Sequence, residues 1–281
     1  MPRIEIARQA GACYGVERAL KMARQASEEA AQPVHTLGPL IHNPLVVSEL
    51  ESAGVRPADT PEEAGEGTLV IRAHGVTPKV ISRAQDLGLA VIDATCPYVK
   101  RVHHAAERLA KAGYQVIVVG ESGHPEVQGI LGHAGEGARV VSTVDDLVNI
   151  ELARKVGVVV QTTQTLAHLR AVVAELLGRV EELTVVNTIC EATSERQLAA
   201  AELAARADAM IVIGGRSSGN TRRLAEICAE RCQNTHHIED ADELVESWFE
   251  RAELIGITTG ASTPADQIER TVHAISQVVG A

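Results

Sequence analysis

Short runs of valine and isoleucine alternate with longer amphipathic stretches along most of the chain. The apolar runs at 116–120, 157–161, 183–186, 210–214 and 254–258 have the length of strands. Uninterrupted apolar runs of this length indicate strands that are buried on both faces of a parallel sheet. The amphipathic stretches at 99–112, 192–207 and 221–231 predict helices. This alternation predicts βαβ units and an α/β fold.

The cysteines reveal an internal period. Cys13, Cys96 and Cys190 each follow an extended or apolar segment and open a predicted helix, and 83 and 94 residues separate them. A polar loop after the next strand places His42, His124 and Ser218 at 29, 28 and 28 residues past the respective cysteine. A second polar turn follows later in each period and contains His74, Thr162 and Ser262.

This period predicts three similar α/β units with pseudo-threefold symmetry. The units cover residues 14–96, 97–190 and 191–281, and the N-terminal segment 1–13 supplies a strand to the third. The alternative is one long doubly wound sheet with accidental spacing. Because ligands bind beyond the carboxyl ends of parallel strands, we expect the cysteines and the polar loops to form a common central site.

Three thiols gathered from distant positions suit a soft metal. Each thiol would lie at a helix N-terminus, where the helix dipole favours the thiolate. An iron–sulfur cubane usually has four cysteine ligands, so three would leave one iron open as a Lewis acid. We therefore expect a central iron–sulfur site. The alternatives are three buried structural cysteines, or zinc with a fourth ligand.

Composition excludes several classes of function. The net charge of −11 and only five aromatic residues among 281 argue against nucleic acid binding. No apolar run approaches the ~18 residues of a membrane span, and the N-terminus has no apolar signal core. We therefore expect a cytoplasmic protein whose five cysteines form no disulfides.

The polar loops are typical of an anion site. A strand, a glycine-rich turn and a helix start expose backbone N–H groups to a phosphate, although ordinary helix caps are the alternative for any one loop. The segment 214–221 imitates a P-loop, but Asn220 stands where that motif requires lysine, which disfavours an NTPase. Glu126 and Glu121 are the only carboxylates in the loop cores. In a dry pocket the pKa of Glu126 would rise, which suits a proton donor; a first-turn helix residue is the alternative.

A second group of possible metal ligands has poor zinc spacing and no counterpart in the period, so we do not expect it to bind metal: Cys228, Cys232, His236 and His237. His103 and His104 are expected on a solvated helix face.

Nine motifs, in order along the chain, resemble those of the LytB/IspH family of 4-hydroxy-3-methylbut-2-enyl diphosphate reductases. They are AGACYGVERAL, GPLIHNPLVV, RAHGV, DATCPYVKRVH, GHPEVQGI, QTT, TICEATSERQ, SSGNTRRLAE and TGASTP. The resemblance covers almost the whole chain. It implies a [4Fe-4S] cluster on Cys13, Cys96 and Cys190, with one open iron.

The resemblance also implies the reaction. Such enzymes reductively remove the hydroxyl of (E)-4-hydroxy-3-methylbut-2-enyl diphosphate, giving isopentenyl and dimethylallyl diphosphate in the last step of the non-mevalonate isoprenoid pathway. Ferredoxin or flavodoxin supplies two electrons, one at a time. Glu126 would deliver protons through a relay with His124 and Thr162. The substrate diphosphate would be held by His42, His74, His124, Ser218, Asn220 and Ser262.

The chain departs from the family pattern at two places. Gly219 stands where many members have a second serine, so its backbone N–H would replace a hydroxyl. Tyr14 and Ala12 replace the alanine and phenylalanine that family members often have around the first cysteine, and this change could favour a related substrate. Two other functions use similar parts, namely a cluster protein that only carries electrons or senses redox state, and an aconitase-like hydro-lyase that needs no electron donor.

Overall fold

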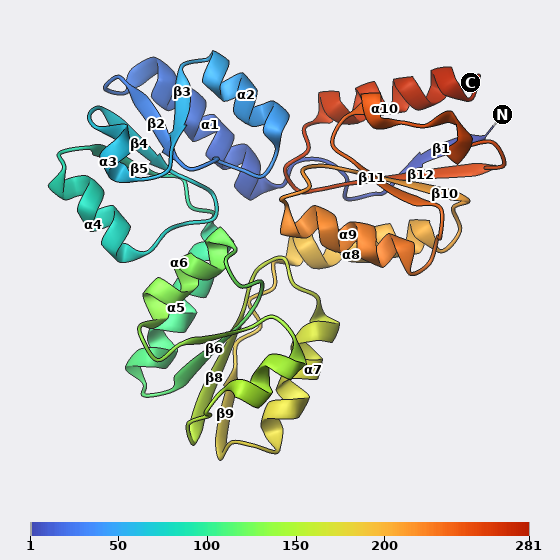
Figure 1. Cartoon of the computed structure of the whole chain (residues 1–281). Helices are drawn as coiled ribbons and strands as arrows, with labels where there is room; N and C mark the ends of the chain where they lie inside the picture. Colours follow the sequence, from blue (N-terminus) through green and yellow to red (C-terminus); the bar gives the residue numbers. More distant parts are fainter. Residues whose placement is uncertain (1, 281) are drawn as a thin grey trace. The chain divides into compact units, whose positions relative to one another are not determined.

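The computed structural model describes residues 2–280 and contains three separate four-stranded parallel sheets (Figure 1). In each sheet the strand order follows the same pattern, with the first and third strands of the repeat at the centre. The prediction of an α/β fold with three similar units is confirmed, and the alternative of one long sheet is wrong. None of the described helices is both long and apolar enough to cross a membrane.

By the density of contacts the chain forms two compact parts. The terminal part comprises the chain up to Val16, His42–Leu45 and the chain from Glu191 onward. The middle part comprises Glu17–Ile41 and Val46–Cys190. The middle part contains two of the sheets and the terminal part contains the third.

The first sheet of the middle part has the order β3-β2-β4-β5. Its strands are β2 (Val34–Leu37), β3 (Val55–Ala58), β4 (Thr68–Ile71) and β5 (Ala90–Asp93). Helices α3 and α4 pack on one face, and α1 and α2 cover the other (Figure 1). These helices are α1 (Tyr14–Glu29), α2 (Pro44–Ser52), α3 (Pro61–Ala64) and α4 (Pro78–Asp86).

The second sheet has the order β7-β6-β8-β9. Its strands are β6 (Gln115–Val119), β7 (Arg139–Val141), β8 (Lys155–Val160) and β9 (Glu182–Val185). Helices α5 (Pro97–Lys111) and α6 (Pro125–Ala134) pack on one face. The opposite face is covered by α7 (Leu166–Leu177) and a 3-10 helix, Val144–Asn149.

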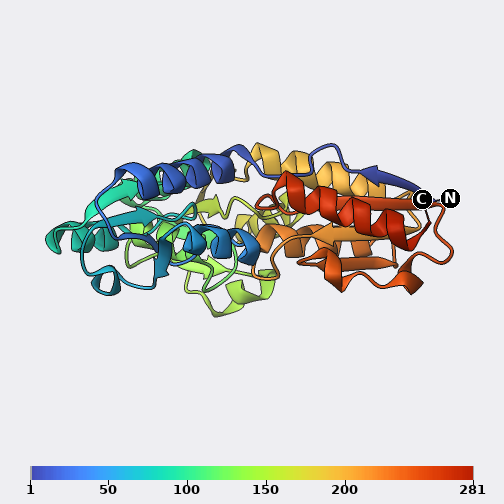
Figure 2. The same ribbon diagram turned by 90° about the horizontal axis from the view of Figure 1, so that it is seen from above.

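The third sheet has the order β1-β12-β10-β11. Its strands are β1 (Arg3–Ile6), β10 (Ala209–Ile213), β11 (Thr235–Ile238) and β12 (Leu254–Thr259). Helices α8 (Glu191–Ala204) and α9 (Gly219–Ala229) cover one face, and α10 (Ala265–Val278) covers the other. Strand β1 pairs with β12, with Arg3 opposite Leu254, so the N-terminal segment supplies a strand to this sheet. The start of β1 and the end of α10 therefore lie side by side (Figure 2).

One hydrogen bond recurs at the same edge of every sheet. In each sheet, the glycine directly after the first of the two central strands donates its N–H to a carbonyl. This carbonyl belongs to the last residue of the outer strand beside it. The three pairs are Gly38–Ala58 at 2.7 Å, Gly120–Val141 at 3.0 Å and Gly214–Ile238 at 2.9 Å. Each glycine lies four residues before His42, His124 or Ser218, so these three side chains occupy equivalent positions, as the period predicts.

His103 is buried, contrary to the expectation of a solvated helix face, whereas His104 is exposed as expected. The His103 ring stacks on His133 of α6 with centroids 4.1 Å apart. A Cβ atom on Gly75 would lie 2.6 Å from the ring, and one on Gly129 would lie 3.1 Å from it. Adjacent residues of an α-helix point in different directions around its axis. The His103 side chain therefore points toward Gly75 and Gly129, whereas that of His104 points to solvent.

We predict that His103 makes the folded protein sensitive to acid. Burial lowers the His103 pKa from 6.5 to about 3, so protons bind preferentially to the unfolded chain below pH 6.5. The free energy of unfolding should therefore fall as the pH drops from about 6.5 toward 4. In His103→Leu this slope should decrease by up to about 1.4 kcal/mol per pH unit.

Denaturant unfolding at several pH values measures this slope. His104→Leu is the matched control because it removes an exposed histidine from the same helix, and its slope should stay close to that of the wild type. An equal slope in His103→Leu and the wild type would contradict the assignment.

Candidate active site

The three cysteines occupy equivalent positions in the repeat. Cys13, Cys96 and Cys190 directly precede α1, α5 and α8, are partly buried and form no disulfide. The backbone N–H of each cysteine donates to a carbonyl in the second polar loop of its own repeat. These bonds are Cys13 to Ala261 at 3.0 Å, Cys96 to Ala73 at 3.0 Å and Cys190 to Thr162 at 3.1 Å. Each cysteine is thereby fixed to a loop that carries a candidate site residue.

These hydrogen bonds also refine the equivalence of the second loops. Ala73, Ala261 and Thr162 accept the same bond and each lies two residues past its central strand. The residue in register with His74 and Ser262 is therefore Thr163. Thr162 lies one position earlier, and its N–H and hydroxyl bond to Glu126.

Glu126 and Thr162 form a buried polar contact in the middle part. Glu126 is the second residue of α6, and its side chain is 2% exposed. The backbone N–H of Thr162 donates to Glu126 Oε1 at 2.6 Å, and the Thr162 hydroxyl donates to Oε2 at 2.8 Å. Glu126 comes from the loop after β6 and Thr162 from the loop after β8, which are neighbouring strands.

The electrostatics of Glu126 suit a proton donor near neutral pH. Loss of hydration raises the pKa of Glu126 to about 7, although the two hydrogen bonds from Thr162 act in the opposite direction. A carboxyl group with this pKa holds a proton on roughly half of the molecules at pH 7.

Two histidines lie beside this carboxyl group. His124 is the N-cap of α6, and its Nδ1 accepts the backbone N–H of Glu126 at 3.1 Å. The ring of His74 meets the ring of His124 edge to face, with centroids 5.7 Å apart. The middle part therefore brings together four predicted site residues: His74, His124, Glu126 and Thr162.

The terminal part contains the remaining predicted substrate residues and brings two of them, His42 and Ser262, into contact. The Ser262 hydroxyl donates to the carbonyl of His42 at 3.1 Å, and a Cβ atom on Gly215 would lie 2.5 Å from that same carbonyl oxygen. Asn43, which the sequence did not single out, is buried and donates to the Ser262 carbonyl at 2.8 Å. Its position directly before Pro44 at a helix start was the available signal, because asparagine is favoured there.

The start of α9 carries an unsatisfied amide. The Ser218 hydroxyl caps the helix by accepting the N–H of Thr221 at 3.3 Å, and Gly219 is the first helical residue. Asn220 is 4% exposed, and neither its amide nitrogen nor its amide oxygen has a hydrogen-bond partner. A buried amide without partners is costly unless a ligand satisfies it.

The described residues contain no preformed group of three or more histidine, cysteine or acidic side chains arranged to hold a metal ion. Cys228 and Cys232 are buried in the apolar core beneath α8 and α9. Burial raises the pKa of Cys228 to about 12, so this thiol is a poor metal ligand.

The chain matches known proteins over almost its full length. Residues 4–276 match the model of the LytB protein family. A 4-hydroxy-3-methylbut-2-enyl diphosphate reductase of Pelobacter propionicus is 45% identical over 276 residues, which cover 98% of each chain. A protein of the same name from Aquifex aeolicus is 46% identical over 282 residues, which cover 99% of this chain and 97% of the relative.

Two solved structures are also similar. One is an (E)-4-hydroxy-3-methyl-but-2-enyl diphosphate reductase described as the terminal enzyme of the non-mevalonate pathway. It is 46% identical, with a TM-score of 0.73 and coverage of 99% of this chain and 100% of that one. The other is the E-1-hydroxy-2-methyl-but-2-enyl-4-diphosphate reductase of Plasmodium falciparum. It is 26% identical, with a TM-score of 0.93 and coverage of 98% and 88%. The chain belongs to the LytB family.

Proposed function

We propose that this protein reductively removes the hydroxyl group of (E)-4-hydroxy-3-methylbut-2-enyl diphosphate, giving isopentenyl and dimethylallyl diphosphate. Relatives that match it over 98% of its length carry the name of that reductase. The observation that carries the proposal is the buried Glu126 carboxyl, held by Thr162 and flanked by two histidines. The reaction takes up two electrons and two protons and releases water, and a buried carboxyl group with a pKa of about 7 supports Glu126 as the proton donor.

The cysteines fit an iron–sulfur cluster by their chemistry. Cys13, Cys96 and Cys190 form no disulfide and lie at helix N-termini, where the dipole stabilises the thiolate that binds iron. We assign them as the three ligands of a [4Fe-4S] cluster. When bound, the cluster would supply single electrons received from a ferredoxin or flavodoxin and a Lewis-acidic iron for the substrate oxygen.

The diphosphate needs donors that the polar loops supply. Ser218, Asn220 and Ser262 offer hydroxyl and amide groups, and the first turn of α9 offers backbone N–H groups, including that of Gly219. The unpartnered amide of Asn220 supports this role because a bound anion would accept its N–H. His42, His74 and His124 would add imidazole N–H groups.

Glu126 has the geometry of a general acid. The hydroxyl of Thr162 donates to its Oε2 and orients the carboxyl group, and Nδ1 of His124 accepts the backbone N–H of Glu126. We propose that Thr162 and His124 also pass the proton between Glu126 and the substrate. The backbone N–H of Thr162 stabilises the carboxylate that remains.

Three further assignments belong to this proposal. The three units extend over 14–96, 97–190 and 191–281, with 1–13 completing the third. The protein works in the cytoplasm, where reduced electron donors are present. Tyr14, whose side chain is 63% exposed, lies next to the cluster ligand Cys13.

Replacing Glu126 with glutamine should abolish most turnover without loss of substrate binding. The amide keeps the shape of the side chain but gives no proton, and lost general acids cost about 10² to 10⁴-fold. The measurement is single-turnover product formation by anaerobically reduced holoprotein. Glu121→Gln is the matched control because it changes a carboxylate of the same loop and should retain activity. Turnover near the wild-type rate in Glu126→Gln would remove Glu126 from the mechanism.

Turnover should also depend on pH through Glu126. The pKa of this group is about 7 and the acid form is active, so the rate should be constant below the pKa and fall about tenfold per pH unit above it. Because a bound diphosphate raises the pKa of a nearby carboxyl group, the midpoint in the complex should lie at or above 7. A rate that rises through pH 7 would have the opposite sign and contradict the assignment.

Iron content distinguishes the proposed ligands from the other thiols. Alanine at Cys13, Cys96 or Cys190 should prevent assembly of the cluster, and Cys228→Ala should leave iron and acid-labile sulfide per chain unchanged. Loss of iron in Cys228→Ala with normal iron in Cys96→Ala would show that the wrong thiols were assigned. An intact cluster without turnover would favour an electron carrier, and dehydration without reductant would favour a hydro-lyase.

A further inference from the structure

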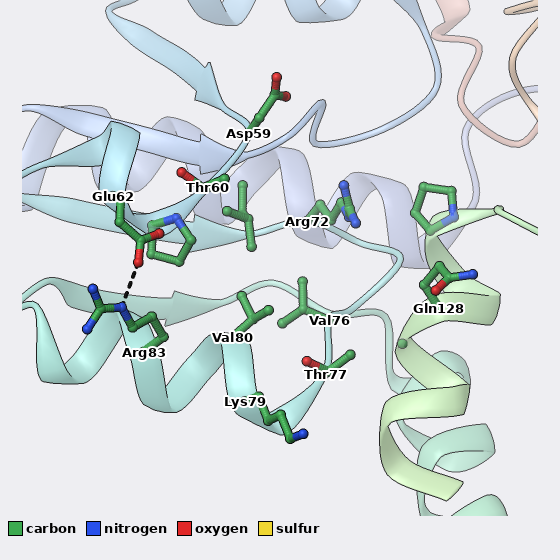
Figure 3. Close-up of a pocket in the computed structure, with 14 residues that line it drawn as sticks. Asp59, Thr60, Glu62, Arg72, Val76, Thr77, Lys79, Val80, Arg83 and Gln128 are labelled. Carbon is green, nitrogen blue, oxygen red and sulfur yellow. Dashed lines mark hydrogen bonds and ion pairs between the residues drawn. The ribbon is translucent and has the colours of Figure 1, made fainter. Parts of the chain in front are cut away.

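A cavity of about 370 Å³ lies within the middle part, apart from the Glu126 contact (Figure 3). Its walls come from the ends of β2, β3 and β4, from α3 and α4, and from the first turns of α6. This volume is in the range of small-molecule sites. Two of its lining residues adjoin the proposed active site, because Arg72 precedes His74 by two positions and Pro125 directly precedes Glu126.

The cavity contains a guanidinium group without an ion-pair partner. The Nε atom of Arg72 is buried and has no hydrogen-bond partner. A Cβ atom on Gly38 would lie 2.6 Å from Arg72 Nη1, so the absence of a side chain at Gly38 makes room for the guanidinium. Burial lowers the Arg72 pKa, and the charge of Asp59 opposes this only in part. In Figure 3 the carboxylate of Asp59 points away from Arg72.

Three basic residues (Arg72, Lys79 and Arg83) and two acidic residues (Asp59 and Glu62) line the cavity, which leaves one positive charge in excess. Arg83 is neutralised by Glu62, with Nε and Oε1 2.6 Å apart. Lys79 also lines the cavity and forms no ion pair with any described residue. A site with unpaired cationic groups in a chain of net charge −11 favours an anionic ligand.

The remaining walls are mostly apolar. Leu37, Pro61, Val76, Val80 and Pro125 line the cavity around Arg72. Such walls gain free energy from covering an apolar group but not from binding a bare inorganic ion. The ligand that matches both features has a charged head and a short apolar tail.

We propose that this cavity is a binding site for a small organic anion. A phosphate or carboxylate head pairs with the Arg72 guanidinium, and an apolar tail of a few carbons packs against Val76 and Val80. Pairing with Arg72 satisfies its Nε–H, which has no partner among residues 2–280. The site is independent of the proposed reaction, because it uses none of the residues assigned to substrate or cluster.

Titration calorimetry with 3-methylbutyl phosphate tests the proposal on the holoprotein. The wild type should bind it in the micromolar to millimolar range. Arg72→Met should weaken binding by at least about tenfold, because a charge-assisted hydrogen bond is lost. Arg83→Met is the matched control, since this arginine lines the same cavity but is already paired with Glu62. Its affinity should stay within about threefold of the wild type.

A second variant and two probes complete the test. Val80→Phe fills the cavity and should weaken binding while Arg72 stays in place, which guards against misfolding of Arg72→Met. 3-Methylbutanol lacks the charged head and inorganic phosphate lacks the apolar tail, so each should bind more weakly than 3-methylbutyl phosphate. Asn220→Ala should weaken only binding of the probe at the proposed substrate site and leave the affinity of the cavity unchanged, because Asn220 does not line the cavity. Binding lost in Asn220→Ala but kept in Arg72→Met and Val80→Phe, or no binding to the wild type, would overturn the proposal.

Discussion

The burial of the Glu126 carboxyl group is the constraint on which the proposed chemistry depends. A carboxyl group 2% exposed and held by the N–H and the hydroxyl of one threonine is denied the water that would keep it ionised. Its pKa of about 7 follows from lost hydration, since no acidic neighbour contributes to the shift. The two hydrogen bonds from Thr162 also fix the orientation of the carboxyl group.

The repeat is what brings Glu126 and Thr162 together. Neighbouring central strands end at the same edge of their sheet, and the glycine and cysteine hydrogen bonds at that edge recur in all three sheets. The same backbone arrangement therefore holds different side chains. His124 and Glu126 follow β6, whereas Ser218 and Asn220 follow β10. Three copies of one strand–loop–helix element thus carry the proposed acid, the proposed anion donors and the three thiols without any change of fold.

The period in the sequence predicted the strands, the helices opened by cysteines and the equivalence of His42, His124 and Ser218, because these follow from local pattern and spacing. It did not resolve the register of the second loops, where Thr163 and not Thr162 is in register with His74, since loop lengths differ between repeats. It did not predict the burial of His103, because two adjacent residues of a helix can be one buried and one exposed. The cavity at Arg72 depends on tertiary packing, which no spacing encodes.

The protonation state of the Glu126 side chain can be observed directly. Infrared difference spectra between the wild type and Glu126→Gln, recorded at a series of pH values, isolate the carboxyl stretch of this one group. We expect a protonated carboxyl band at pH 6 that is replaced by carboxylate bands with a midpoint near pH 7. A carboxylate signal that persists to pH 5 would show that Glu126 is ionised under working conditions and would contradict its role as the acid.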